Sequence, residues 1–156
     1  MQKRTAKGEA LTEIILETLR FNGALLSAGN KLTKPHGLTS ARWQVMGAID
    51  LEGKPLTVSQ IARRMGLTRQ AVQRVVNYLA RLDMVVLSEN LDHKRAPLVS
   101  ISKAGEAVMK EIDQVQAAWV NSLAKDFEEK KLKQALEVLQ NVRETTEQFN
   151  QTLQEK

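Results

Sequence analysis

The segment TVSQIARRMGLTRQAVQRVVNYLARL, residues 57–82, carries the strongest structural signal in the chain. Thr57 and Gln60 have the spacing of a capping box, in which the threonine oxygen and the glutamine side chain satisfy free backbone amides at the start of a helix. Gly66 is placed to end that helix after barely two turns, and Thr68 is placed to cap a second one. The segment therefore predicts two helices joined by a tight turn.

The second of these helices divides its side chains between two faces. Its apolar residues recur at helical spacing and predict an inward face: Val72, Val75, Val76, Leu79 and Leu82. The outward face then holds Arg69, Gln70, Gln73, Arg74 and Asn77. Arg can bond guanine through two hydrogen bonds, and Gln or Asn can do the same with adenine. This face holds no acidic residue, whereas an ordinary solvated helix face mixes acidic and basic side chains. The pattern therefore favours contact with nucleic acid.

The period of the sequence changes after this helix. Residues 84–87 and 98–101 are β-favouring and predict two strands, and residues 90–97 between them are too polar for a core. They predict an exposed basic loop with His93, Lys94 and Arg95 at its tip, which suits phosphates and the narrow minor groove. A merely solvated loop is the alternative. Two helices followed by this ribbon predict a helix-turn-helix with a β-wing, whose second helix enters the major groove.

Long amphipathic helices flank this unit. Residues 9–32, 102–127 and 129–153 repeat apolar side chains at spacings of three and four, and residues 39–51 predict a shorter helix. A small winged domain cannot cover all of these apolar stripes, so we predict that a second subunit covers them. An intramolecular three-helix bundle is the alternative.

Length and charge fit a single nucleic-acid-binding domain. The 156 residues suffice for one domain, and 42% hydrophobic and 26% charged residues are ordinary for a folded protein. The formal net charge is +5, and residues 54–103 hold nine basic residues against three acidic ones. A basic centre in a nearly neutral frame predicts a face that binds a polyanion, although a solvated surface that happens to be basic is the alternative.

Several classes of function lack the residues that they need. There is no cysteine, and the two histidines lie far apart, which argues against thiol chemistry and a metal site and leaves both histidines as ordinary loop residues. No phosphate-binding glycine cluster, nucleophile elbow or paired carboxylates are visible, so the sequence predicts no enzyme, no catalytic residue and no cofactor. The few aromatic residues disfavour single-stranded nucleic acid. No apolar run approaches the ~20 residues of a membrane span, so a cytoplasmic protein without membrane contact is the default expectation.

The order and spacing of several segments resemble the multiple antibiotic resistance regulator (MarR) family of bacterial winged-helix transcription factors. The resemblance covers residues 9–149, and its segments are GLT (37–39) with RWQVM (42–46), TVSQIA (57–62), LT (67–68) through RVVNYL (74–79), and DHKRAPLVSISKAG (92–105). It implies an obligate homodimer, held by its terminal helices, that binds a pseudopalindromic operator. It also implies release of the operator when a small, frequently aromatic or phenolic, ligand binds between two lobes. Arg95 matches the wing arginine of the family.

Two positions depart from the family pattern. Asp83 stands where the family usually has glycine, and aspartate can adopt the left-handed conformation at some cost. Leu87 stands where the family commonly has arginine, so the phosphate or structural contact made by that arginine does not carry over to this chain. No residue matches a redox-sensing cysteine, which excludes the peroxide-sensing branch unless a bound cofactor intervenes.

We therefore predict a mainly α protein with a small antiparallel β-wing, a winged helix-turn-helix with long N- and C-terminal dimerisation helices. Residues 1–156 form one domain, in which residues 9–34 and 103–153 are the dimerisation region and residues 38–102 the DNA-binding lobe. The expected function is a sequence-specific, double-stranded DNA-binding transcriptional regulator, acting as a ligand-responsive repressor. A winged-helix protein-interaction module and a non-specific architectural DNA-binding protein are the alternatives. DNA contacts are predicted for Thr68, Arg69, Gln70, Gln73, Arg74, Asn77, His93, Lys94 and Arg95.

Overall fold

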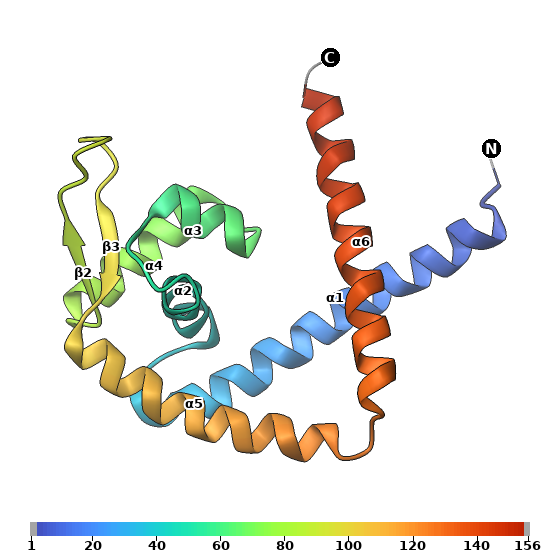
Figure 1. Ribbon diagram of the computed structural model, residues 1–156, viewed down its shortest axis with the longest axis horizontal. Helices are drawn as coiled ribbons and strands as arrows, with labels where there is room; N and C mark the ends of the chain where they lie inside the picture. Colours follow the sequence, from blue (N-terminus) through green and yellow to red (C-terminus); the bar gives the residue numbers. More distant parts are fainter. Residues whose placement is uncertain (1–2, 155–156) are drawn as a thin grey trace. The chain divides into compact units, whose positions relative to one another are not determined.

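The chain folds mainly into helices, with one small antiparallel sheet (Figure 1). The computed structural model describes residues 3–154, so the ends of the predicted domain, residues 1–2 and 155–156, lie outside the described residues. In chain order the elements are α1 (Ala6–Thr33), the 3-10 turn η1 (Lys34–His36), α2 (Ser40–Asp50), β1 (Leu56–Thr57), α3 (Val58–Met65), α4 (Arg69–Arg81), β2 (Val85–Ser88), β3 (Leu98–Ile101), α5 (Lys103–Ala124) and α6 (Glu129–Gln154). The chain divides between Val115 and Gln116 into two compact units.

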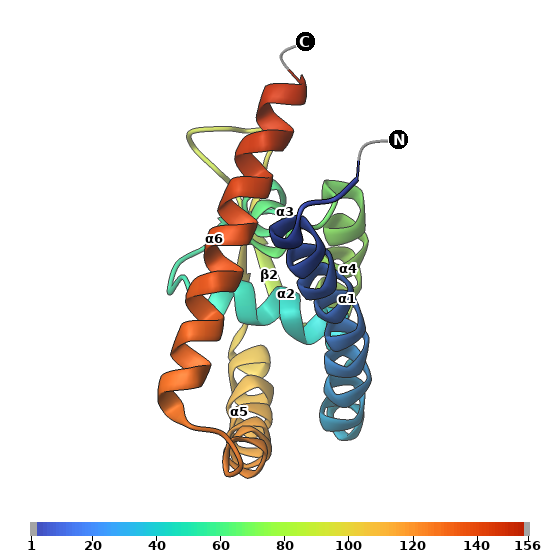
Figure 2. The ribbon, with the colours of Figure 1, turned by 90° about the vertical axis from the view of Figure 1, so that its right-hand side faces the viewer.

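Helix α2 lies at the centre of the first unit. It contacts α1, α3, α4 and β3, and Figure 2 shows it running across the directions of α1 and α4. The core around it includes fully buried side chains from α2, α3, α4, β3 and α5: Val45, Met46, Ile61, Val72, Val76, Leu79, Val99 and Ile112. Val75 is half-buried, and only Leu82, which follows the end of α4, departs from the predicted inward face, because 40% of it is exposed.

The sheet has three strands in the order β1-β3-β2. Strands β2 and β3 form the predicted wing hairpin, with Val85 opposite Ile101 and Ser88 opposite Leu98. Strand β1 adds a third strand, because Leu56 pairs with Val99 on the other edge of β3. The prediction of a two-stranded ribbon therefore missed β1, whose two residues are too few to show an alternating pattern.

The expected helix caps are present. The Gln60 amide donates to Thr57 Oγ1 at 3.2 Å, and the Thr57 amide donates to Gln60 Oε1 at 2.8 Å, which completes the capping box. Gly66 ends α3 with a φ of 62°. Asp83 has a φ of 54°, which is the left-handed conformation expected at this position. The Ser102 hydroxyl donates to the Asp83 carbonyl oxygen. Helix α5 stops at Ala124, three residues before the predicted end at Phe127.

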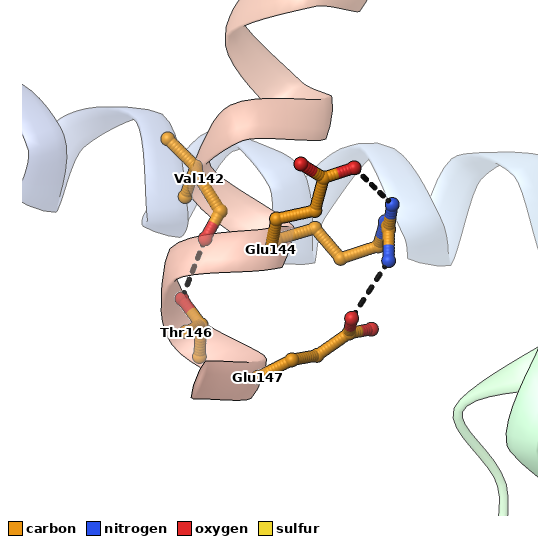
Figure 3. A network of polar contacts seen from close by, with 5 residues as sticks. Val142, Glu144, Thr146 and Glu147 are labelled. Atoms are coloured by element: carbon orange, nitrogen blue, oxygen red, sulfur yellow. Dashed lines mark hydrogen bonds and ion pairs between the residues drawn. The ribbon is translucent and has the colours of Figure 1, made fainter. Parts of the chain in front are cut away.

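The second unit contains the end of α5 and the whole of α6. Polar contacts within α6 support its helical conformation (Figure 3). Arg143 donates to Glu147 at 2.8 Å and to Glu144 at 3.0 Å, while the Thr146 hydroxyl donates back to the Val142 carbonyl at 2.8 Å. Pairs of this kind contribute only about 0.2–0.5 kcal/mol each, so they supply only a small part of the stability of the helix.

Candidate nucleic-acid interface

The outward face of α4 is exposed as predicted. Thr68 accepts a hydrogen bond from the Ala71 amide at 3.2 Å and so begins the helix. All five side chains predicted on that face are exposed: Arg69, Gln70, Gln73, Arg74 and Asn77. Gln73 Nε2 donates to Asn77 Oδ1 at 2.8 Å, which leaves Gln73 with one N–H and its oxygen available to an adenine edge.

A cavity of about 580 Å³ lies between the start of α3, the start of α4 and residues 95–97 of the wing. Its walls are Thr57, Val58, Ser59, Thr68, Arg69, Gln70, Gln73, Arg95, Ala96 and Pro97. The fold thus brings Arg95 of the wing to the same cavity as Thr68 and three predicted α4 residues, Arg69, Gln70 and Gln73. Arg74, Asn77, His93 and Lys94 are exposed but do not line this cavity.

Ser59 lines the cavity but was not among the predicted site residues. Its hydroxyl stands in the first turn of α3, beside the capping threonine. The capping box located the start of this helix in the sequence, but the pairing of β1 with β3 brings that start next to the wing. Sequence reasoning missed β1 and therefore had no reason to select Ser59.

Residues 90–97 form the wing loop, and hydrogen bonds within the loop hold its backbone in place. Its tip residues His93, Lys94 and Arg95 are exposed as predicted, but Asn90 is buried, with 7% of its surface accessible. The Asn90 side chain donates to the Ala96 carbonyl at 2.9 Å and accepts from the Asp92 and His93 amides at 3.1 and 3.3 Å. The interpretation of this loop as wholly exposed was therefore wrong at its first residue.

The basic residues of the central segment do not all contribute to one positive face. Glu52, with only 20% of its side chain exposed, pairs with Arg64 at 2.6 Å and with Lys54 at 3.3 Å, so its one negative charge offsets part of theirs. Within residues 3–154, no carboxylate forms an ion pair with Arg69, Arg74 or Arg95. Arg69 and Arg74 of α4 and Arg95 of the wing loop therefore keep their positive charge unpaired within these residues.

Two further cationic side chains meet an aromatic ring on another part of α4. The Arg42 guanidinium lies over the Tyr78 ring at 3.5 Å from its centre, and that of Arg81 lies at 5.7 Å. A cation over a tyrosine face contributes about 0.5–1 kcal/mol at an exposed site. The Arg42 contact joins α2 to α4 and so helps to hold α4 in place, whereas the Arg81 contact lies within α4.

Neither histidine lines the cavity. His36 is not an ordinary loop residue, because its Nδ1 lies 3.2 Å from Glu111 of α5 and only 16% of its side chain is exposed. His93 lies exposed in the wing loop. The part of the chain that the structure describes holds no group of three or more residues able to bind a metal ion, and none of its helices is long and apolar enough to span a membrane.

Known proteins share both the sequence pattern and the fold. A model of the MarR family matches residues 36–96, which include every residue lining the cavity except Pro97. An uncharacterised protein of Mycobacterium bovis is 33% identical over 116 residues, 74% of this chain and 80% of that protein. The transcriptional regulator BldR from Sulfolobus solfataricus has the same fold, with a TM-score of 0.77 at 21% identity over 91% of this chain and 99% of that one. CouR from Rhodococcus jostii RHA1, in a structure bound to p-coumaroyl-CoA, gives a TM-score of 0.74 at 20% identity over 83% of this chain and 90% of that one.

Proposed function

Because this chain belongs to the MarR family of transcriptional regulators, we propose that it regulates transcription by binding double-stranded DNA with sequence preference. One observation carries the proposal: the acid-free face of α4 and Arg95 of the wing border a single cavity. A helix fits the major groove, and a basic loop beside it reaches phosphates and the adjacent minor groove. Both parts can therefore contact one DNA duplex together.

We assign different tasks to the two parts of this interface. Gln70, Gln73, Arg74 and Asn77 have the side chains that read base edges, and Thr68 and Arg69 stand at the start of α4, where backbone amides and positive charge favour phosphates. His93, Lys94 and Arg95 are assigned to phosphates and the minor groove. The α4 residues then determine sequence preference, whereas the wing contributes affinity that depends on salt concentration.

The regulator acts as a homodimer in this proposal, with residues 9–34 and 103–153 as its dimerisation region. Apolar side chains remain exposed along α1 and along α6, and among them are Leu11, Ile15, Leu19, Leu132, Leu136, Leu139 and Phe149. Stripes of this size favour burial against a second copy. A twofold axis then places the two α4 helices on successive turns of one duplex, so half-sites lie about 10–10.5 base pairs apart.

A small aromatic effector that releases the DNA completes the proposed function. CouR, which shares the fold, is bound to p-coumaroyl-CoA in its structure. The matching test adds a panel of aromatic acids and their thioesters to the protein–DNA complex. Dissociation by one member of the panel identifies the effector class, and unchanged binding with every member removes this part of the proposal.

Selection of bound duplexes from a random pool tests the main proposal. We expect enrichment of a pseudopalindrome and a steep fall of affinity with salt, because each neutralised phosphate adds about 0.9 to the slope of log K against log salt. Equal affinity for every duplex would instead identify an architectural protein, and absence of DNA binding would favour a protein-interaction module. Inserting five base pairs between half-sites rotates one of them by half a turn, and should abolish dimeric binding.

A further inference from the structure

One buried asparagine connects the two ends of the wing loop. Asn90 begins the loop and is 7% exposed, whereas the residues that follow it, Leu91 to Arg95, are all exposed. Its side chain makes three hydrogen bonds: two accepted from the Asp92 and His93 amides, and one donated across the loop to the Ala96 carbonyl. The same short side chain thus uses both its acceptor and its donor.

The bond to Ala96 fixes the part of the loop that reaches the DNA-facing cavity. Arg95, Ala96 and Pro97 line that cavity opposite α4. The Ala96 amide also donates to the His93 carbonyl at 2.8 Å, and the His93 amide donates to the Asn90 carbonyl at 3.2 Å, so the loop consists of two linked turns. The backbone that carries Arg95 is therefore held between two hydrogen-bonded residues, His93 and Ala96, that both connect to Asn90.

Resting on the proposed function, we infer that Asn90 is a positioning residue for DNA binding, which holds Arg95 beside the recognition helix α4 without itself contacting DNA. Only an amide of this length supplies both groups, because aspartate lacks the donor, and serine and alanine do not reach Ala96. A loop without these bonds samples many conformations and must be ordered on binding, which lowers affinity. Part of the contribution of Arg95 to binding is then lost although Arg95 is still present.

The test compares Asn90→Ala and Asn90→Ser with Arg95→Ala and with the double variant Asn90→Ala/Arg95→Ala. Affinity for the selected duplex is measured by fluorescence anisotropy at several salt concentrations. We expect both Asn90 variants to bind about 10-fold more weakly, close to the loss caused by Arg95→Ala. We also expect them to lower the salt slope by about 0.9, the value for one phosphate, although neither substitution removes a charge. Leu91→Ala, which changes an 84% exposed side chain of the same loop, is the matched control and should leave both quantities unchanged.

The double variant separates positioning from an independent contribution. If Asn90 acts through Arg95, the double variant binds no more weakly than Arg95→Ala alone. Fully additive losses overturn the inference, and so does parental affinity and salt slope in either Asn90 variant. If a thermal melt shows that Asn90→Ala does not fold, Asn90→Ser replaces it in the comparison with Arg95→Ala. Serine can keep the first turn of the loop.

DNA binding by the parent protein distinguishes failure of this inference from failure of the proposed function. Failure of the parent to bind any duplex refutes DNA binding itself. Normal binding by the parent together with unaffected Asn90 variants refutes only the role of Asn90. Faster exchange of the Asp92 and His93 amides in Asn90→Ala, with unchanged exchange in α4, locates the loss of order in the wing loop.

Discussion

Arg74 is the arginine that stands within α4, beyond its first turn, on the exposed face. Arg74→Ala is expected to cost about 1–3 kcal/mol on the preferred duplex and to relax preference at one or two base positions, because an arginine that bonds guanine twice discriminates against other bases. Repeating the duplex selection with the variant measures both effects. Arg143→Ala removes the same charge from α6 and should preserve the selected sequence. Identical preferences for parent and Arg74→Ala contradict the assignment of this face.

Gly105 is the glycine whose replacement should harm the fold most. It is buried in α5, where an added Cβ would collide with the Met84 carbonyl oxygen and lie 2.8 Å from Ile101 Cγ2. Gly105→Ala is therefore expected to lower the free energy of unfolding by about 1–3 kcal/mol. Gly23→Ala is the matched control, because no atom lies within 4 Å of its added Cβ, and helix propensity predicts a gain of up to about 1 kcal/mol. Denaturant unfolding of both variants measures the contrast, and equal stabilities contradict it.

Asp113 is expected to make the stability of the fold depend weakly on pH. Its pKa is raised above the usual value, first because partial burial disfavours the charged carboxylate and second because Asp50 carries the same charge nearby. A carboxyl with a higher pKa in the folded chain favours folding at low pH, and this contribution is lost as the pH rises through that pKa. Asp113→Asn should therefore raise the free energy of unfolding at pH 7 by less than about 1 kcal/mol. This gain should disappear at about pH 3, where the carboxyl of Asp113 is protonated.

Urea unfolding of Asp113→Asn at several pH values measures this difference. Asp50→Asn is the companion variant, and it should lower the pKa of Asp113 in an NMR titration because it removes the like charge. A stability difference that stays constant from pH 3 to pH 7 would show that the substitution acts through packing instead.

At the scale of elements, local signals predicted helices well. The capping box, Gly66 and Thr68 each act within a few residues, so their pattern in the sequence located α3 and α4. The outward face of α4 followed from helical spacing alone, and all five of its predicted side chains are exposed. Elements of this kind can be predicted because the interactions that begin and end them lie within the same short segment.

The missed features depend on contacts between distant segments. Strand β1 exists because two residues after Pro55 pair with β3, and neither residue carries a pattern of its own. Glu52 compensates Arg64 across a turn and a helix, which a charge count along the chain does not reveal. The polar loop pattern likewise gave no sign that Asn90 is buried, because its partner Ala96 lies at the other end of the loop.

For the whole molecule, the proposed dimer depends on the apolar side of α6. Leu139 is 41% exposed there. Leu139→Glu should shift the protein toward monomers, because an ionised carboxylate in an apolar interface costs several kcal/mol. Affinity for the two-site duplex should then fall by about 100-fold, since the second half-site is no longer linked to the first. Light scattering and anisotropy measure the two effects.

Gln148→Glu is the control for this substitution. It adds the same charge nine residues further along α6, which at 100° per residue places it on the opposite side of the helix. The control should remain dimeric and bind DNA nearly as tightly as the parent. A Leu139→Glu variant that stays dimeric at micromolar concentration would remove α6 from the proposed interface.

The pairing of β1 with β3 has a consequence for the order of events in folding. Leu56 and Val99 are neighbours in the sheet although roughly 40 residues separate them, and the closed loop contains α3, α4 and β2. Closing such a loop costs about 3 kcal/mol of chain entropy, which helices with local contacts do not incur. We therefore expect this pairing to form after the folding barrier, so that Leu56→Ala accelerates unfolding much more than it slows refolding in stopped-flow experiments. The cavity proposed to face DNA, whose walls meet across this pairing, is then among the last parts of the fold to assemble.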